Sequence, residues 1–417
     1  MSWTRADAAE RDAHDPLARC ADQFVVPDPS LVYLDGNSLG RLPRRTEAAL
    51  AEAVTRGWGG RLVRGWSEWI DLPHEVGDRL GRAVLGAAPG QVVVCDSTTV
   101  NLFKLIAAAV DVRPDRRVLV TDDGNFPTDR YVVEGIARQR GLDVRWVKTD
   151  PIHGVQPDQA GTAIDEDVAM ATFSYVDFRS GAVADIVALT DLVHAAGGLV
   201  LWDLSHAAGS VPVELDRWGV DLAVGCTYKY LNGGPGAPAW LYVRREWQER
   251  LAPPVWGWFG HADQFGMGSP FRAAAGMARW LAGTPPVLGL VAVDEGVAMI
   301  EEVGMDHIRA KGLALTSYAA SLADAWLRSL GFVVASPADA SKRGSHLAFR
   351  HPEAYRLSRA LVDAGVIGDF RPPDVVRLGF SPLSTRFTDV WDGLDRLRQL
   401  AAGSAWTAYD PTPERVT

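Results

Sequence analysis

The 417-residue sequence contains few cysteines, and this scarcity limits where the protein is expected to work. Cys20, Cys95 and Cys226 lie far apart and form none of the close pairs that structural zinc sites use. Three is also an odd number, which argues against a disulfide framework. The cysteines therefore predict a reducing compartment, and we expect a cytoplasmic protein.

Other features that would define a location or a partner are also missing. The first twenty residues are charged and lack the apolar stretch of a signal peptide, and no apolar run reaches the roughly 20 residues of a membrane-spanning helix. The chain carries 42 Lys and Arg against 52 Asp and Glu, a formal charge of -10, and has no basic run. We therefore expect an acidic globular protein that binds neither nucleic acid nor a membrane surface.

Short apolar runs are present in regular alternation with helical patterns between about residues 90 and 245. The seven predicted strands cover residues 91–97, 117–122, 143–149, 167–174, 198–205, 221–227 and 238–244. Apolar residues recur at helical spacing over 99–112, 128–141 and 185–198, between these strands. The alternation predicts an α/β fold with a mostly parallel seven-stranded sheet and helices on both of its faces.

The pattern changes after about residue 285. Predicted helices cover 44–62, 287–303 and 306–329, and predicted strands cover 331–337, 345–350 and 375–381. A sequence of helices and strands without regular alternation is typical of an α+β unit. We therefore expect a large domain over 51–285 and a smaller α+β domain formed by 1–50 and 286–417.

Polar side chains follow the predicted strands, at the sheet edge where α/β proteins bind ligands. In "CDSTTVNLF", Thr98 and Thr99 open a helix and offer hydroxyl and backbone N–H groups to a phosphate, although simple capping of the helix by Ser97 or Thr98 is the alternative. In "NFPTDRY", Asp129 either caps a helix or contacts a ligand. Phe126, in the same segment, could provide a flat surface for a heteroaromatic ring.

The segments "VLWDLSHAAG" and "GCTYKYLNGGPG" point to one cofactor. Asp203 ends an apolar strand, where a protonated pyridine nitrogen would pair with it, although a buried salt bridge is the alternative. His206 either contacts the same ring or is a core histidine. Lys229 follows the next strand and suits a lysine that binds an aldehyde. Together with an aromatic and a phosphate-binding turn, these residues meet the needs of pyridoxal 5'-phosphate.

With these residues identified, the chain resembles the kynureninases, fold-type-I pyridoxal-phosphate enzymes of the aminotransferase class V superfamily. The resemblance runs from "YLDGNSLG" through "STTVN", "FPTD", "WDLSHAAG", "YKYLNGGPGAP", "GWFGH" and "GTPPVL" to "VIGDFRPPDVVRLGFSPL". It implies hydrolysis of the Cβ–Cγ bond of L-kynurenine, or of its 3-hydroxy form, to L-alanine and anthranilate or 3-hydroxyanthranilate. It also implies a homodimer with shared sites, and a place in tryptophan catabolism, NAD biosynthesis or secondary metabolism.

The resemblance further implies roles for single residues. Lys229 is expected to bind the cofactor aldehyde and to take the substrate's Cα proton, while Asp203 pairs with the ring nitrogen and Phe126 stacks on the ring. Tyr228 is an implied phosphate contact, and by general-acid logic it is also the expected acid for the β-carbon when the carbon–carbon bond breaks. The other implied cofactor contacts are Thr98, Thr99, Asp129, Ser174, His206, Trp258 and, from the second subunit, Thr284. The implied substrate contacts are Arg377, which binds the α-carboxylate, Asn37, Ser38 and Phe259.

Parts of the sequence depart from the family pattern. Ser384 stands in "SPLSTRF" where an aromatic residue is expected, and "FSYVDFRSG" is an uncommon version of its segment. These departures leave open whether a ring-substituted kynurenine is the substrate. One alternative is a lyase such as a cysteine desulfurase, but that activity needs a cysteine on a mobile loop, and Cys226 lies in a predicted strand. The other is a non-catalytic binding protein, which would not need an aldehyde-binding lysine.

Overall fold

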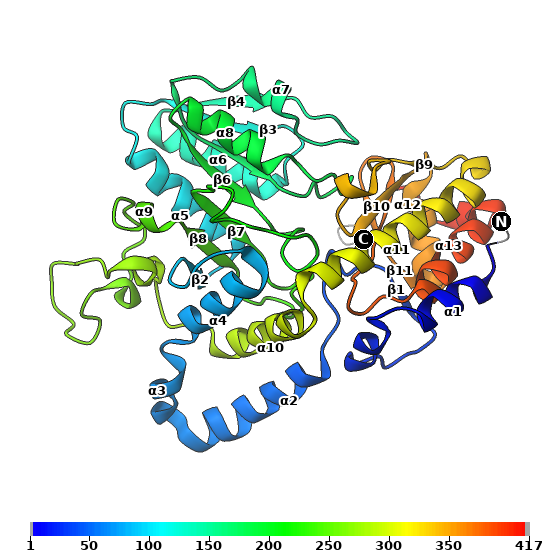
Figure 1. Ribbon diagram of the computed structural model, residues 1–417, viewed down its shortest axis with the longest axis horizontal. Coiled ribbons are helices and arrows are strands. Elements are labelled where there is room, and N and C mark those ends of the chain that lie inside the picture. Colours follow the sequence, from blue (N-terminus) through cyan, green and yellow to red (C-terminus); the bar gives the residue numbers. More distant parts are fainter. Residues whose placement is uncertain (1–2, 413–417) are drawn as a thin grey trace.

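A seven-stranded sheet forms the centre of the larger part of the molecule in the computed structural model, which describes residues 3–412 (Figure 1). Its strands are β2 (Val92–Val94), β3 (Val118–Asp122), β4 (Asp143–Val147), β5 (Val168–Ser174), β6 (Leu199–Asp203), β7 (Leu222–Gly225) and β8 (Trp240–Val243). The order is β2-β8-β7-β6-β5-β3-β4, in which only β8 runs antiparallel to its neighbours. The predicted mostly parallel sheet is confirmed.

Helices cover both faces of this sheet, so that six of the strands are nearly all buried apolar residues. One face is covered by α5 (Thr98–Asp111) and α6 (Pro127–Arg140), whose Leu105 and Ile136 belong to one apolar core. The other is covered by α4 (Leu72–Leu80), α8 (Ile186–Ala195) and α10 (Val287–Val303), which supply a second core. The edge strand β4 is the exception, since only its last residue is buried.

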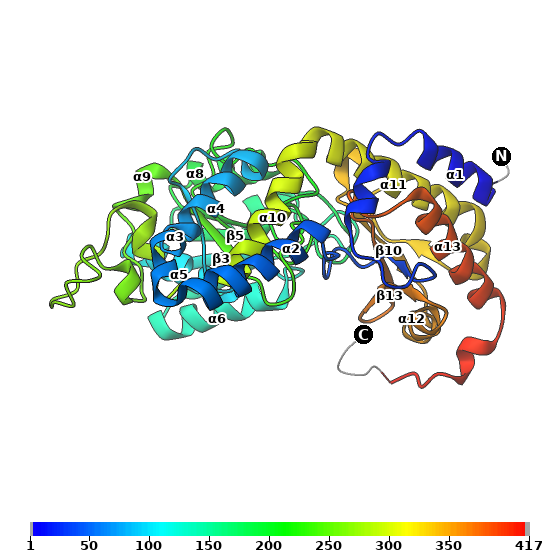
Figure 2. The same ribbon diagram turned by 90° about the horizontal axis from the view of Figure 1, so that it is seen from below.

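A second, smaller sheet lies at the other end of the molecule (Figures 1 and 2). Its antiparallel strands are β9 (Val333–Val334), β10 (His346–Arg350), β12 (Asp369–Arg371) and β13 (Val375–Gly379), in the order β12-β13-β10-β9. The helices around it are α1 (Arg5–Ala13), α11 (Met305–Trp326), α12 (Ala354–Asp363) and α13 (Phe387–Ala402). Helix α13 was not predicted from the sequence, nor were β12 and the short parallel pair β1 (Val32–Tyr33) and β11 (Val366–Ile367).

The segment predicted as one helix over residues 44–62 is helical but changes its winding. It begins as α2 (Arg44–Glu52) and continues as a π-helix over Ala53–Arg61, ending where Leu62 adopts a φ of 53°. Three glycines, at 57, 59 and 60, fall in the wider part and lower its preference for α-helical geometry. The predicted helix is confirmed, although only its first part is α-helical.

Helix α10 shows how closely the two parts of the molecule are joined. It follows residue 285, where the smaller domain was expected to begin, yet it packs on α2 and α4 and contributes Leu290 and Val293 to the larger core. The division into 51–285 and the remainder therefore stays a prediction. Within residues 3–412, no helix is both long and apolar enough to cross a membrane.

Candidate active site

Lys229 lies at the carboxyl edge of the large sheet, on the loop that follows β7. Its side chain is buried, and Nζ is 3.3 Å from Nε2 of His206 and 5.9 Å from the centroid of the Phe126 ring. Burial and the nearby Lys229 lower the pKa of His206 well below its usual value, so the imidazole is neutral. The sequence-predicted lysine, histidine and aromatic ring are thus brought together.

The loop around Lys229 is fixed by its own backbone and by the N-terminal segment. Asn232 N–H donates to the Lys229 carbonyl at 3.0 Å, and Asn232 itself has a φ of 55°, a conformation that asparagine tolerates better than most residues. Gly40 N–H donates to the Tyr228 carbonyl at 2.8 Å, and a Cβ at Gly40 would collide with the Lys229 carbonyl. "DGNSLG" therefore packs directly against the lysine loop, which explains its final glycine.

Two carboxyl groups lie beside the lysine. Asp203 ends β6 and accepts a hydrogen bond from Ser205 N–H at 2.8 Å, and Asp129 comes from the first turn of α6. Burial raises the pKa of both carboxyls, and the charge of Asp203 raises that of Asp129 further. Oδ2 of Asp129 is buried and has no hydrogen-bond partner within residues 3–412. An unpaired buried oxygen beside Asp203 fits a site for a protonated ring nitrogen.

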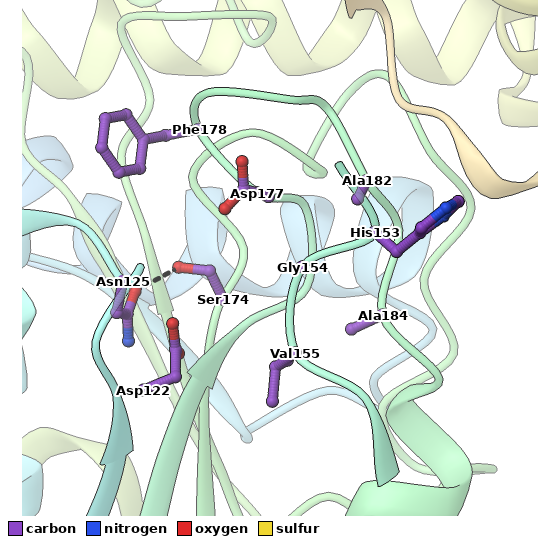
Figure 3. A pocket seen from close by; sticks show the side chains of 10 residues that line it. All are labelled: Asp122, Asn125, His153, Gly154, Val155, Ser174, Asp177, Phe178, Ala182 and Ala184. Atoms are coloured by element: carbon purple, nitrogen blue, oxygen red, sulfur yellow. Dashed lines mark hydrogen bonds between the residues drawn. The ribbon is translucent and has the colours of Figure 1, made fainter. Parts of the chain in front are cut away.

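Ser174 is paired with Asp203 across the sheet and lines a small cavity together with Asn125 and Phe178 (Figure 3). Ser174 Oγ donates to Oδ1 of Asn125 at 2.8 Å, and Phe126 packs edge-on against Phe178 with ring centroids 5.2 Å apart. The cavity encloses only about 10 Å³, room for one water molecule, so it is not a substrate pocket. Asp122 lines it, and burial raises the pKa of that carboxyl to about 8.

Arg377, on β13 of the smaller sheet, is held by more partners than the sequence indicated. Its side chain is 1% exposed, and Nε donates to Oδ1 of Asp369 at 2.8 Å. Nη2 donates to Oδ2 of Asp369 at 2.5 Å and to Oγ of Ser38 at 2.9 Å, and Nη1 donates to the carbonyl of Phe178. Asp369 was missed, although it stands in "GDFRPP", a segment already noted for its resemblance.

Asn37 and Asp35 complete the surroundings of Arg377. Asn37 is fully buried against Gly379, two residues after Arg377, and neither of its side-chain polar atoms has a partner within the described residues. The backbone of Asp35 forms an isolated parallel β-bridge with Gly379. Burial and the charge of Asp369 raise the pKa of Asp35 to about 7, while Arg377 lowers that of Asp369. The N-terminal segment thus brings an amide and a titratable carboxyl to the guanidinium.

The residues expected around a phosphate are more dispersed. Ser97 caps α5 by accepting from Val100 N–H, which confirms the capping alternative, and the next two residues, Thr98 and Thr99, are half-buried and exposed. Trp258 is 42% exposed and Thr284 is exposed. No hydrogen bond or ring contact within residues 3–412 joins either of them to Lys229.

Phe259 lies away from the lysine as well. It is buried between Trp258 and Trp66, with ring centroids 4.5 Å and 6.4 Å away. No ring contact within residues 3–412 joins Phe259 to Lys229, so its contact with the substrate stays a prediction. The segment after α9 (Arg245–Gln248), which leads to these aromatics, extends outward from the larger part of the molecule (Figures 1 and 2).

Comparison with solved structures identifies the class of fold. A cysteine desulfurase from Thermococcus onnurineus NA1 superposes with a TM-score of 0.78 and 18% identity, covering 96% of this chain and 100% of that one. The cysteine desulfurase CsdA from Escherichia coli gives 0.80 and 17%, covering 93% and 98%. These identities establish the fold alone. With Asp203 ending β6 and Lys229 following β7, the chain has the architecture of pyridoxal-phosphate enzymes of this type.

Comparison with curated sequences identifies the family. Residues 308–397 match the family model of the kynureninase C-terminal domain. The kynureninase of Pseudomonas fluorescens is 41% identical over 411 residues, and that of Burkholderia pseudomallei (strain 1106a) is 40% identical, each alignment covering 97% of both chains. The chain belongs to the kynureninase family, as its resemblance predicted.

Proposed function

We propose that this protein is a kynureninase that uses pyridoxal 5'-phosphate to hydrolyse the Cβ–Cγ bond of L-kynurenine or of a ring-substituted kynurenine. The products are L-alanine and the corresponding anthranilate. The observation that carries the proposal is the near full-length identity with kynureninases at about 40%. The buried centre of Lys229, His206, Asp203 and Asp129 supports it, because a protein without this chemistry would not need such a set of buried titratable groups.

When bound, pyridoxal phosphate supplies an aldehyde that takes up amines and a ring that withdraws electrons from the substrate's Cα. Lys229 is the residue placed to bind that aldehyde, with Phe126 against the ring. Asp203 and Asp129 would hold the ring nitrogen and its proton between them. Lys229 would also be the base that removes the Cα proton of the substrate. Neutral His206, 3.3 Å away, accepts a hydrogen bond from the resulting ammonium group.

Arg377 is proposed to bind the substrate α-carboxylate. Asp369 already pairs with Nε and Nη2, so the carboxylate would approach the Nη1 and Nη2 end, sharing Nη2 with Ser38 and Nη1 with the Phe178 carbonyl. There a guanidinium offers two parallel hydrogen bonds to a carboxylate. Binding at this end fixes Cα relative to Lys229, because Arg377 and the lysine loop are both held by the N-terminal segment.

Tyr228 is the proposed acid for the carbon that leaves the aryl ketone. Burial raises the pKa of its phenol above the usual value, so the hydroxyl keeps its proton at neutral pH. The phenol ring centroid is 5.8 Å from Lys229 Nζ. Tyr228→Phe is expected to slow turnover without loss of the bound cofactor's absorbance; unchanged turnover would contradict the role.

The proposed function is tested by incubating the purified protein and cofactor with L-kynurenine, 3-hydroxykynurenine and ring-methylated kynurenines. Anthranilate fluorescence and L-alanine should appear in equal amounts, and the substrate with the highest kcat/KM defines the ring preference. Release of alanine from cysteine instead would favour the desulfurase alternative. That alternative lacks a suitable group, because burial raises the pKa of Cys20, Cys95 and Cys226.

We also propose that the enzyme is a cytoplasmic homodimer. A groove of about 400 Å³ runs beside Thr284 and is lined by Trp58, Trp66 and Trp69. The side chains of Trp58, in this groove, and of Trp256 and Phe265, in the segment after α9, are at least 60% exposed. An apolar face of this kind is suited to a second copy, which would bring Trp258 and Thr284 to the partner's phosphate. Molar mass measured by light scattering across a dilution series tests this arrangement.

A further inference from the structure

Lys104 is a buried cation that the proposed reaction does not use. It lies on α5, its side chain is 1% exposed, and Nζ is 2.5 Å from Oδ2 of Asp96. The same Nζ donates to the carbonyl of Trp280 at 2.7 Å. Position 104 faces an apolar core that includes Leu105 and Ala108, where an apolar side chain would be ordinary. Buried ion pairs are weak stabilisers compared with apolar residues of similar size, so stability alone does not account for this lysine.

The partner of Lys104 stands in the turn that leads from β2 into α5. Asp96 has a φ of 50°, a backbone conformation that favours glycine and that other residues adopt with strain. A second side chain of α5 supports the same turn, since Asn101 Nδ2 donates to the Cys95 carbonyl at 2.9 Å. Two residues one helical turn apart thus reach back to fix the start of their own helix, directly before Thr98.

The second contact of Lys104 leads to another part of the cofactor site. Trp280 ends a short 3-10 helix over Gly276–Trp280, and Thr284 follows four residues later on the exposed face. One ammonium group therefore connects the turn before Thr98 with the segment that carries Thr284. In the proposed dimer these two segments serve different sites, one in this chain and one in its partner.

We propose that Lys104 is a positioning residue for the cofactor phosphate, which it serves by holding Asp96 and anchoring Trp280. The proposal rests on the proposed use of pyridoxal phosphate. Lys104 acts in two ways: it keeps the turn in its strained conformation, and it neutralises a carboxylate that would otherwise repel a phosphate at Thr98 and Thr99. Both effects concern the phosphate and leave the pyridine end of the cofactor untouched.

The test compares Lys104→Met with Lys311→Met. Lys311 is a matched control, because it also forms a buried ion pair, at 2.7 Å from Asp15, in the smaller part of the molecule. Apoprotein is titrated with pyridoxal phosphate and with pyridoxal, following cofactor absorbance. Lys104→Met should lower the affinity for pyridoxal phosphate roughly tenfold or more, and that for pyridoxal less than twofold. Lys311→Met should leave both affinities unchanged, whatever it does to the melting temperature.

A double variant separates positioning from general damage. In Asp96→Gly with Lys104→Met, glycine adopts the positive φ freely and the repelling carboxylate is gone, so phosphate-dependent affinity should return. If Lys104→Met does not fold, Lys104→Gln keeps a polar side chain without the charge, so Asp96 stays unneutralised and the same selective loss should appear. The proposal would be overturned if the ratio of the two affinities were unchanged in the Lys104 variants. It would also be overturned if the affinity for pyridoxal phosphate did not recover in the double variant. A wild-type protein that binds no pyridoxal phosphate would instead refute the proposed function.

Discussion

The two ends of the predicted cofactor site differ in how one chain builds them. At the end near Lys229, three other titratable side chains are buried. Lys229 contacts His206, and Asp203 and Asp129 lie close to each other. Trp258 and Thr284, expected at the phosphate, are exposed, and no hydrogen bond or ring contact within residues 3–412 joins them to Lys229. In our proposal one chain forms the reacting end, whereas the phosphate end depends on a second copy. Binding of the phosphate and assembly of the dimer would then be one linked equilibrium.

The largest effect should come from the complete end. Lys229→Ala removes both the cofactor attachment and the base, so kcat should fall by roughly 10³-fold or more. Steady-state assays with L-kynurenine measure the loss. With pyridoxal phosphate in excess the variant should remain dimeric, because the substitution leaves the proposed phosphate contacts intact. If this variant lost the dimer, Lys229 would affect assembly as well as catalysis, and the proposed difference between the two ends would be contradicted.

A smaller effect is expected at the carboxylate site. Arg377→Lys loses the two parallel hydrogen bonds of a guanidinium and leaves Asp369 less well paired, so KM should rise roughly ten- to a hundredfold. The matched control is Arg350→Lys, since Arg350 pairs with Asp374 on the surface, where an ion pair matters little. The role would be contradicted if KM moved equally in both variants.

The exposed end is tested by Thr284→Ala, which should weaken cofactor affinity roughly tenfold by removing one hydrogen bond to a charged phosphate. Mixing this variant with Lys229→Ala gives a sharper answer. If Thr284 serves the partner's site, each mixed dimer contains one site with native Lys229 and native Thr284. Activity at limiting cofactor should then exceed the sum of the two separate variants. Simple additivity would place Thr284 outside the partner's site.

The smallest effect concerns pH. Asp35 faces Asp369, Arg377 and Arg371, and its pKa is raised to about 7. Below pH 7 it is protonated and Arg377 keeps its attraction for an anionic substrate, whereas above pH 7 its charge opposes binding. KM should therefore rise roughly three- to tenfold from pH 6 to pH 8, and Asp35→Asn should remove that rise. The exposed Asp28→Asn serves as control and should keep the wild-type profile.

The same carboxyl makes a prediction for stability. The folded pKa of Asp35 lies above the unfolded value near 3.8, so the folded protein binds this proton more tightly. Its contribution to the free energy of unfolding is fully present below about pH 4 and is lost as pH rises to about 7. Denaturant unfolding of wild type and Asp35→Asn across this range measures the effect: wild type should lose stability relative to the variant as pH rises, because the amide does not titrate.

Much of this architecture could be predicted from the sequence because its signals are local. The strands ending at Asp203 and Ser174 are continuous apolar runs, and their ends place side chains at one sheet edge. Asp369, Asp35 and Lys104 were missed, since each gains its meaning from a partner distant in the fold or hidden in a core. A lysine in an amphipathic helix gives no sign that it points inward. Helix α13 was missed although its Leu394 and Leu397 are buried at helical spacing.

The hydrogen bond between Ser38 and Arg377 joins residues 339 positions apart. During synthesis the N-terminal segment leaves the ribosome long before β13 exists, and the loop of Lys229 emerges between them. Asn37 and Ser38 therefore cannot make their final contacts until almost the whole chain has been synthesised. Because the closing contact forms last, a nascent chain cannot recognise substrate, and truncation near either terminus should abolish recognition even when the large sheet is intact.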